Sequence, residues 1–416
     1  MRHKGQGAYD HLRRYYGRRR MKTKIVAVGA LFALLLSGCK KVEEKPTVKV
    51  GLLYSLTGAM AQSEIPVCDI ERMAIDEINS SGGVLGHTIE VVQLDGESKP
   101  QRFAELARKM LTEDKVATIF GCWTSASRKE VKTVVEEEDI FGLLWYPLQY
   151  EGLEASPNIM YMGAAPNQQV IPAVDYCLRN FGKRVFLVGS DYVFPRTAGE
   201  MVKAYLSHIK GKCVGERYVD MECEDFSDVI KQIKASKPSV ILNTLNGSSN
   251  KAFFAQLKAA GIGANKIPVM SFSVSESEVS YIGSDLLEGH YVSWSYLQTI
   301  SSFHNHLFVS RFKKRFGEDR VIGDPMEAAY IAVYLWAAAC EKAGTFNVED
   351  VRMAAKGLTF DAPEGSVTID GENQHLKKQV RIGRVNAKGL IDEVWRSDNL
   401  VKPDPYLSTY VWAKGL

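Results

Sequence analysis

The sequence predicts an α/β protein with two domains, each built around a parallel β-sheet. The chain has 416 residues, more than one ordinary domain needs. Its composition is 45% hydrophobic and 24% charged, as in globular proteins. From Thr47 onward, short apolar runs alternate with amphipathic helical patterns. Such alternation is typical of parallel sheets with crossover helices, and a second set of the same units begins near residue 184.

The first set contains four expected strands separated by helices. The apolar runs are TVKVGLLYSL (47–56), HTIEVVQLD (87–95), VATIFG (116–121) and GLLWYP (142–147). The first helix is expected at about 64–79, with Ser63 as its N-cap and Pro66 in its first turn. A second helix is expected within 99–114, where apolar residues recur with helical spacing, and a third at about 127–137.

The second set begins after a helical segment at 167–182. Its expected strands are RVFLVGS (184–190), SVILNTL (239–245), IPVMSFS (267–273) and HYVSWSYL (290–297). Two further helices are expected within 301–317 and 324–344. The C-terminal region alternates like an antiparallel strand pair that turns at Lys388-Gly389.

The N-terminal residues resemble an export signal. The segment from Met21 has two lysines, then an apolar run from Ile25 to Leu36 that is too short to span a bilayer. Leu36-Ser37-Gly38-Cys39 resembles the bacterial lipobox, in which the cysteine is acylated and becomes the first mature residue. Residues 1–39 are therefore expected to be a signal segment that ends in a lipidated Cys39. The alternative is a plain signal peptide with a chance cysteine.

Removal of this segment changes the sign of the net charge. Nine of the 52 Lys and Arg residues and one of the 49 Asp and Glu residues lie in 1–39, which leaves 43 against 48. The formal charge of +3 becomes −5, so the sequence gives no support for nucleic-acid binding. Six cysteines follow Cys39 without CxxC or Cys/His spacing, so no metal site is expected. Cys213 and Cys223 flank a turn-like segment and could form a disulfide.

The residues after the expected strands indicate a binding site. Ligands of open parallel sheets bind beyond the carboxyl ends of the strands, near helix N-termini. Aromatic and uncharged or acidic polar side chains gather there, which suits a small, planar, neutral polar ligand. The candidate ligand-binding residues are Tyr54, Trp123, Thr124, Ser125, Tyr146, Gln149, Tyr150, Glu151, Asp191, Tyr192 and Ser273.

Each of these residues also has a purely structural interpretation. The hydroxyls after Trp123 could cap a helix, and Trp123 itself could belong to the core. Asp191 and Tyr192 could be solvated loop residues, and Glu151 a surface charge. The sequence contains no GxSxG, HExxH, Walker or GxGxxG motif, and no histidine lies at these junctions. Cys122 could be a nucleophile at a helix N-terminus, but no nearby histidine would activate it. Neither an enzyme nor a cofactor is therefore expected.

Several blocks in the same order also carry a family resemblance. They are GLLYSLTGAMA, INSSGGVLG, FGCWTSASRK, YPLQYEG, GAAPNQQ, GSDYVFPRT and DPMEA. From Val48 to about Trp395 the chain resembles the substrate-binding proteins of urea and short-chain amide ABC transporters. That family is a branch of the branched-chain amino acid binding proteins with the type I periplasmic fold. The tail after Trp395 matches no motif, and we expect it to cover the second lobe.

The resemblance implies two Rossmann-like lobes hinged by three crossovers, closing on solute without chemistry. The expected lobes are 47–165 plus about 293–355, and 166–292 plus about 356–416. It further implies a monomer that is lipid-anchored at the outer face of the cytoplasmic membrane or in the periplasm. The protein would deliver its solute to an ABC transporter permease. An amide-sensing regulator and a receptor for branched-chain amino acids are the alternatives.

The resemblance places the ligand near the Trp123 turn and the Tyr146–Glu151 loop, with Asp191 and Tyr192 opposite. Urea has two NH₂ groups, so it needs acceptors on both flanks, and Glu151 and Asp191 are the candidates. An amino acid would need partners for both an ammonium and a carboxylate. Trp123 would leave little room for its side chain, which disfavours that ligand.

Overall fold

The computed structural model describes residues 45–415, and residues 45 onward form one compact unit. The predicted signal segment and Cys39 lie outside the described residues. The first lobe is built on a parallel sheet of order β2-β1-β3-β4-β5. Its strands are β1 (Thr47–Tyr54), β2 (Thr88–Asp95), β3 (Ile119–Gly121), β4 (Leu144–Tyr146) and β5 (Ile159–Tyr161). The four strands predicted here are confirmed, and β5 is an addition.

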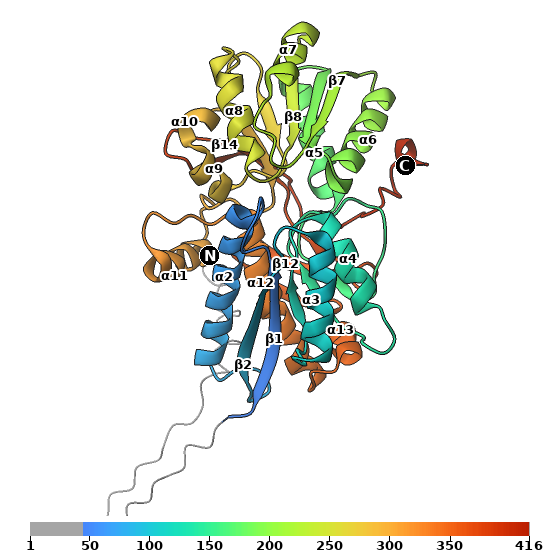
Figure 1. The fold of residues 1–416 in the computed structure, drawn as a ribbon, viewed down its shortest axis with the longest axis vertical. Helices are drawn as coiled ribbons and strands as arrows, with labels where there is room; N and C mark the ends of the chain where they lie inside the picture. The colour runs from blue at the N-terminus through green and yellow to red at the C-terminus, as the bar shows by residue number, and fades with distance from the viewer. Residues whose placement is uncertain (1–44, 416) are drawn as a thin grey trace, which may run out of the picture. The chain divides into compact units, whose positions relative to one another are not determined.

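Helices pack around this first sheet in two groups, α2 with α12 and α13, and α3 with α4 (Figure 1). The bounds are α2 (Ala61–Ser80), α3 (Pro100–Thr112), α4 (Ser125–Val135), α11 (Phe303–Phe316), α12 (Asp324–Ala343) and α13 (Val348–Ala355). The expected N-cap of α2 is wrong, because the helix begins earlier and Met60 occupies that position. Helix α4 also begins earlier than expected, at Ser125, because Thr124 provides its cap.

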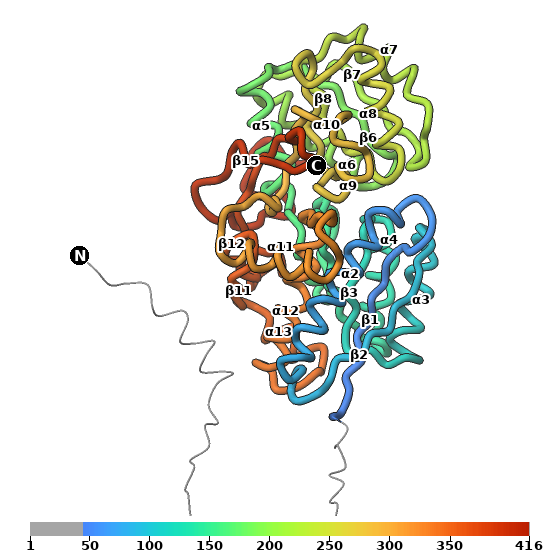
Figure 2. The backbone as a smooth tube through the Cα atoms, turned by 90° about the vertical axis from the view of Figure 1, so that its left-hand side faces the viewer, coloured from blue at the N-terminus to red at the C-terminus, as the bar shows by residue number. Residues whose placement is uncertain are grey.

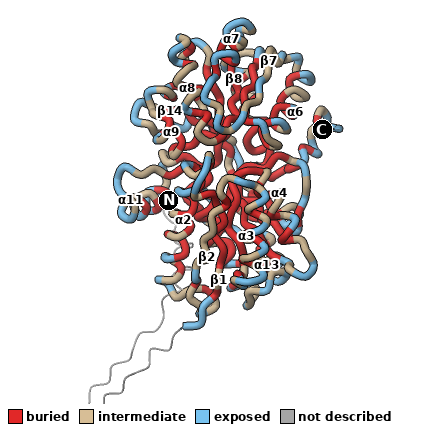
Figure 3. The backbone as a smooth tube through the Cα atoms, in the orientation of Figure 1, coloured by how far each residue is buried: buried red, intermediate tan, exposed pale blue. Residues whose placement is uncertain are grey.

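The second lobe contains a mixed sheet of order β15-β14-β10-β9-β8-β6-β7. Its strands are β6 (Arg184–Ser190), β7 (Lys212–Val219), β8 (Val240–Thr244), β9 (Val269–Ser271), β10 (Tyr291–Trp294), β14 (Arg381–Val385) and β15 (Ile391–Arg396). The helices are α5 (Val170–Asn180), α6 (Val193–His208), α7 (Ser227–Ser236), α8 (Ser249–Ala259), α9 (Glu276–Ile282) and α10 (Ser284–Leu287). Strands β14 and β15 form the predicted antiparallel pair. Figure 3 shows the strands of both lobes running through buried interior.

A small antiparallel sheet corrects the expected division between the lobes. It consists of β11 (Thr359–Ala362), β12 (Gly365–Ile369) and β13 (Leu376–Lys377). Residues from about 356 onward were expected in the second lobe. Val367, Ile369 and Leu376 instead pack in the hydrophobic core of the first lobe, and Figure 2 shows β11 and β12 beside α11 and α12. The chain therefore returns to the second lobe only at about residue 378.

Three segments of the described chain cross between the lobes, near residues 162–169, 295–302 and 378–380. Buried charges tie them together. Lys378 Nζ in the third segment donates to the carbonyl of Met162 in the first, at 3.0 Å. Asp324 Oδ2, at the start of α12, accepts from the backbone N–H of Ser295 in the second, at 2.9 Å. Because unpaired charges are costly to bury, these bonds hold the crossovers together.

The C-terminal tail packs against both lobes. Its short helix η2 (Val411–Ala413) lies on α6, and Leu407 and Ala413 join the second-lobe core, as expected. Tyr406 packs edge-on against the ring of Tyr150 in the first lobe. The cysteines at 68, 122, 177, 213, 223 and 340 are all free thiols, so the Cys213–Cys223 pairing is not formed in the described structure.

Candidate functional site

The turn between β3 and α4 brings Trp123 to the second lobe. Thr124 caps α4, because its hydroxyl accepts from the backbone N–H of Ser127 at 3.1 Å. The indole of Trp123 is almost fully buried, and its Nε1 donates to Oδ1 of Asn246 at 3.4 Å. Asn246 follows β8 in the second lobe. The indole is therefore part of a contact between the two lobes.

The loop after β4 makes a second contact of this kind. Tyr146 donates its hydroxyl to the carbonyl oxygen of Trp123 at 2.8 Å, which joins the loop to the turn. Gln149 Nε2 donates to the carbonyl of Phe272 and to Oγ of Ser273, both at 3.2 Å. Both acceptors follow β9, in the second lobe. The carboxyl ends of β3 and β4 thus face those of β8 and β9, as expected for parallel sheets.

Beneath this loop lies a fully buried arginine that was not among the predicted site residues. Arg128 donates through Nη2 to Glu151 Oε1 at 2.6 Å and through Nη1 to Glu151 Oε2 at 3.0 Å. Ser125 Oγ donates to the same Glu151 oxygen at 2.7 Å. The guanidinium lies 5.0 Å from the ring centroids of both Tyr146 and Tyr150. Burial by itself would raise the pKa of the Glu151 carboxyl, but Arg128 holds it below the ordinary value.

Two candidate residues of the second lobe lie after β6 and differ in their surroundings. The Asp191 side chain is 43% exposed and forms an ion pair with Arg196, with Nε to Oδ1 at 2.5 Å. Tyr192 is half-buried, and burial raises the pKa of its hydroxyl. The carboxylate of Glu151 and the hydroxyl of Tyr146 raise it further, so Tyr192 faces the first lobe. Asp191 lies at the rim, whereas Tyr192 lies against the buried contact.

Two other candidates are held within the first lobe. Tyr54 donates its hydroxyl to Oε1 of Glu71 at 2.6 Å, inside the core beneath the sheet. The hydroxyl of Tyr150 accepts from the backbone N–H of Glu154 at 2.7 Å, and its ring packs on Tyr161. The structure therefore places Tyr54 outside the contact between the lobes and gives Tyr150 a supporting position.

The contact also contains polar atoms that no described residue satisfies. Oε1 of Gln149 and Oε1 of Gln169 are both buried and accept no hydrogen bond within residues 45–415. Gln169 and Arg128 were missed as site residues. Gln169 nevertheless lies in the sequence block GAAPNQQ, and Arg128 lies in the block FGCWTSASRK. A run of charges in a helical pattern gives no sign that one of them is buried. The best signal for Gln169 was its place at the end of the block GAAPNQQ, just after the expected boundary of the first lobe at residue 165.

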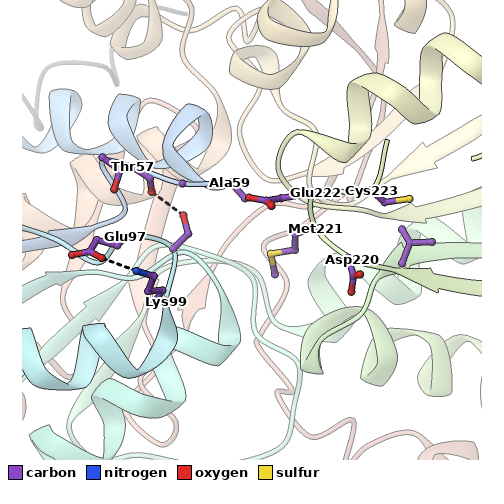
Figure 4. Close-up of a pocket in the computed structure, with 11 residues that line it drawn as sticks. Thr57, Ala59, Glu97, Lys99, Asp220, Met221, Glu222 and Cys223 are labelled. Atoms are coloured by element: carbon purple, nitrogen blue, oxygen red, sulfur yellow. Dashed lines mark hydrogen bonds and ion pairs between the residues drawn. The ribbon is translucent and has the colours of Figure 1, made fainter. Parts of the chain in front are cut away.

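An open groove lies between the lobes beside β1 and β2 on one side and β7 on the other. Its volume is about 1030 Å³, and Figure 4 shows side chains of the two lobes facing one another across it. Glu97 and Lys99 of the first lobe pair with each other at 2.9 Å. Asp220 and Glu222 lie opposite. None of the predicted ligand-binding residues lines this groove.

No group of side chains in the described part of the chain could hold a metal ion. Among residues 45–415, no helix is both long enough and apolar enough to span a membrane. What the contact between the lobes offers is a set of hydrogen-bond donors and acceptors with aromatic walls. Such a set can bind and orient a small solute.

Comparison with known proteins identifies relatives. The chain is 22% identical over 368 residues to a Leu/Ile/Val-binding protein homologue of Brucella melitensis, which covers 87% of this chain and 93% of that protein. A 130-residue stretch is 32% identical to a limonene hydroxylase of Geobacillus stearothermophilus, but it covers only 24% of that protein. The activity in that protein's name is therefore not transferred to this chain.

Solved structures share the fold. A solute-binding protein of an ABC transporter from Rhodopseudomonas palustris, in complex with 3,4-dihydroxybenzoic acid, has a TM-score of 0.76 at 22% identity and covers 86% of this chain and 99% of its own. A leucine-binding protein from Thermotoga maritima has a TM-score of 0.74 at 21% identity, covering 84% and 98%. These likenesses confirm the predicted two-lobe α/β fold. A family model described as a periplasmic binding protein domain matches residues 48–411, so the chain belongs to the periplasmic binding protein family.

Proposed function

We propose that this protein binds urea or a short-chain amide between its lobes and delivers it to the permease of an ABC transporter. The observation that carries the proposal is the side chain of Gln149. Its Nε2 is fixed by two acceptors of the second lobe, while its buried Oε1 accepts from no described residue. A buried acceptor without a donor is costly, and an amide NH₂ supplies the missing donor.

The charges at the contact favour a neutral ligand. Arg128 is held by Glu151 and Glu154, and Lys129 by the same two carboxylates, so the four charges balance. A carboxylate ligand would need a cation that is free to pair with it. Arg128 is buried and its charge is already paired with Glu151 in a bidentate ion pair, although its Nε donates to no described residue.

The distances across the contact favour a small ligand. Trp123 lies 3.4 Å from Asn246, and Gln149 lies 3.2 Å from Ser273, atom to atom. The walls of the contact are thus separated by little more than hydrogen-bond lengths. A solute of a few heavy atoms would need only a small opening of the lobes to enter this contact, whereas a leucine side chain or a benzoate ring would need a larger one.

The N-terminus of α4 supplies donors for the carbonyl oxygen of the ligand. The first N–H groups of a helix have no partner within the helix, and its dipole favours negative charge there. Thr124 satisfies the N–H of Ser127, which leaves those of Ser125 and Ala126 nearest the turn. A ligand carbonyl at this position would place its NH₂ toward Gln149. Glu151 is engaged by Arg128 and Ser125, so in this proposal it supports the wall, and Gln149 takes the acceptor role that was expected of Glu151.

The proposal also includes the lipid anchor on Cys39, which lies outside the described residues. Growth of the producing cells with a radioactive fatty acid tests it. A labelled protein that loses its label in a Cys39→Ala variant is expected. An unlabelled protein would contradict the anchor but would leave the ligand proposal untouched, because a soluble periplasmic receptor binds solute equally well.

Calorimetric titration of the purified mature protein with urea, formamide, acetamide, leucine and 4-hydroxybenzoate tests the ligand. We expect binding of urea or an amide, and no heat of binding from leucine or 4-hydroxybenzoate. Preferential binding of leucine would overturn the proposal and favour an amino acid receptor, the alternative suggested by the names of the relatives. Release of ammonia from a bound amide would instead indicate an enzyme.

A further inference from the structure

Two neighbouring glutamines behave differently in the first crossover. Gln168 and Gln169 are both fully buried, and each uses its Nε2 to bond two backbone carbonyls. Oε1 of Gln168 also accepts from the backbone N–H of Ala165 at 3.0 Å, so that side chain is fully satisfied. Oε1 of Gln169 accepts from no described residue. Only one of the two glutamines therefore presents an unused acceptor.

Gln169 and Gln149 meet at one backbone carbonyl. The oxygen of Phe272 accepts from Gln149 Nε2 at 3.2 Å and from Gln169 Nε2 at 3.1 Å. Gln149 comes from the first lobe and Gln169 from the start of α5, so the two amide groups approach from different elements. The two unused oxygens therefore belong to amide groups that meet at this carbonyl.

The orientation of both amides is fixed by their partners. A flipped Gln169 would direct its oxygen at the carbonyls of Phe272 and Ser293, and a flipped Gln149 would direct its oxygen at Phe272. Two facing acceptors repel, so the Nε2 groups must point toward the carbonyls. Each Oε1 then has to accept from something else, since a buried acceptor without a partner is costly.

From this arrangement we infer that Gln149 and Gln169 form a paired acceptor that selects a ligand with two N–H donor groups over a ligand with one. The inference rests on the proposed function and narrows the ligand class to solutes that carry two N–H donor groups. Urea carries two NH₂ groups, one for each Oε1, whereas acetamide has a methyl group in place of one of them. Acetamide can satisfy only one of the two glutamines at a time.

Variants at both positions test the pairing, with the ratio of urea to acetamide affinity as the readout. Gln149→Met and Gln169→Met each keep the length of the side chain and remove the whole amide, acceptor and donor together, so the ratio of the two affinities, and not either affinity alone, reports the lost acceptor. Each variant is expected to weaken urea binding about fivefold or more, as the loss of one hydrogen bond allows. Acetamide, which keeps the other glutamine, is expected to lose less than about twofold, so the ratio falls.

Gln168→Met is the matched control. It removes a neighbouring buried glutamine whose bonds are all made within the protein. We expect it to lower the melting temperature while the ratio of the two affinities stays unchanged. A purely structural role of Gln169 would move both affinities together in the same manner. That result, or a bound water that satisfies both oxygens in the ligand complex, would overturn the inference.

The failure of the proposed function has a different signature. If wild-type protein binds neither urea nor acetamide, the ligand class is wrong and the ratio has no meaning. If wild-type protein binds both equally well and the variants leave the ratio unchanged, the ligand class stands and the paired acceptor is wrong.

Discussion

The two sides of the contact between the lobes use the same ion-pair chemistry in opposite surroundings. On the first-lobe side, Arg128 and Glu151 form a bidentate pair with both side chains fully buried. On the second-lobe side, Arg196 and Asp191 form a pair with both side chains about half exposed. Bonds from Ser125 and two tyrosine rings surround the first pair. The first side is thus fixed by buried contacts, whereas the ion pair on the second side is open to solvent.

This difference sets what each pair contributes to the protein. A charge that is buried without its partner destabilises a protein strongly, whereas an exposed pair is screened by water and salt. The Arg128–Glu151 pair also positions the loop that carries Gln149 and the turn that carries Trp123. The Arg196–Asp191 pair supports only the rim.

The largest effect is expected from Arg128→Met. It leaves buried Glu151 with Lys129, at 3.5 Å, as its remaining cationic partner, and should lower the free energy of unfolding by up to about 3 to 5 kcal/mol. Differential scanning calorimetry measures the change without adding urea, the proposed ligand. Arg196→Met is the matched control, and its melting temperature should equal that of the wild type. Equal losses in the two variants would show that the two sides do not differ.

The next effect is a pH dependence that the buried carboxyls impose. Burial raises the pKa of Glu276, just after Ser273, to about 8, and nearby Asp324 raises it as well. In the unfolded chain the pKa of this group lies near the ordinary glutamate value of 4.5. Between these two values the folded protein holds a proton that the unfolded chain has lost. The stabilisation that Glu276 gives the folded protein is therefore fully present below pH 4.5 and is lost as the pH rises through about 8.

Glu276→Gln removes this titration. The variant should lose less stability than the wild type between pH 5 and 7, by up to about 1.4 kcal/mol per pH unit. Thermal unfolding across that range measures the slope. Burial raises the pKa of Glu64 in the first lobe to about 8 as well, so Glu64→Gln should flatten the curve in the same way. Parallel curves for wild type and both variants would contradict the assignment.

A smaller effect is expected from Trp123→Phe. The ring is kept, but the N–H that reaches Asn246 is lost, so urea binding should weaken by about 0.5 to 1.5 kcal/mol. Trp145→Phe is the control on the neighbouring strand, since that indole is buried in the first-lobe core. It should reduce the melting temperature and leave the affinity alone. A lower melting temperature with unchanged affinity in Trp123→Phe would show that Trp123 has only a structural role in the core.

The smallest effect is expected from Asp191→Asn. Because Asp191 is exposed and paired with Arg196, its loss should leave both the melting temperature and the affinity for urea unchanged. Calorimetric titration of the variant decides the point. A tenfold loss of affinity would restore Asp191 as the acceptor on the second flank, the role first expected from the sequence.

The sequence predicted the elements that carry strong periodicity. The alternation from Thr47 to Trp294 predicted most of the parallel strands in both sheets, but not β7 (Lys212–Val219), and Gly121 followed by hydroxyl residues marked the start of α4. Strand β5 was missed, because three residues inside a polar segment show no pattern. The small sheet was assigned to the wrong lobe, because apolar alternation indicates a buried face without indicating which core buries it.

The sequence predicted where the candidate site lies, but it predicted the roles of the individual residues less well. Trp123, Gln149, Tyr192 and Ser273 come together because strand ends of the two lobes face one another. The role of Glu151 was not predictable, because its partner Arg128 lies 23 residues earlier in the chain. In the sequence Arg128 is one charge in a run of polar residues. Only the packing of α4 under three tyrosine rings makes it a buried cation.

Equilibrium dialysis of the wild-type protein with radiolabelled urea tests the central claim most directly. The sample is then challenged with an excess of acetamide, leucine or 4-hydroxybenzoate. We predict that urea is retained, and that acetamide displaces it while leucine and 4-hydroxybenzoate do not. Failure to retain urea, or displacement of urea by leucine, would contradict the claim that a neutral amide occupies the contact between the lobes.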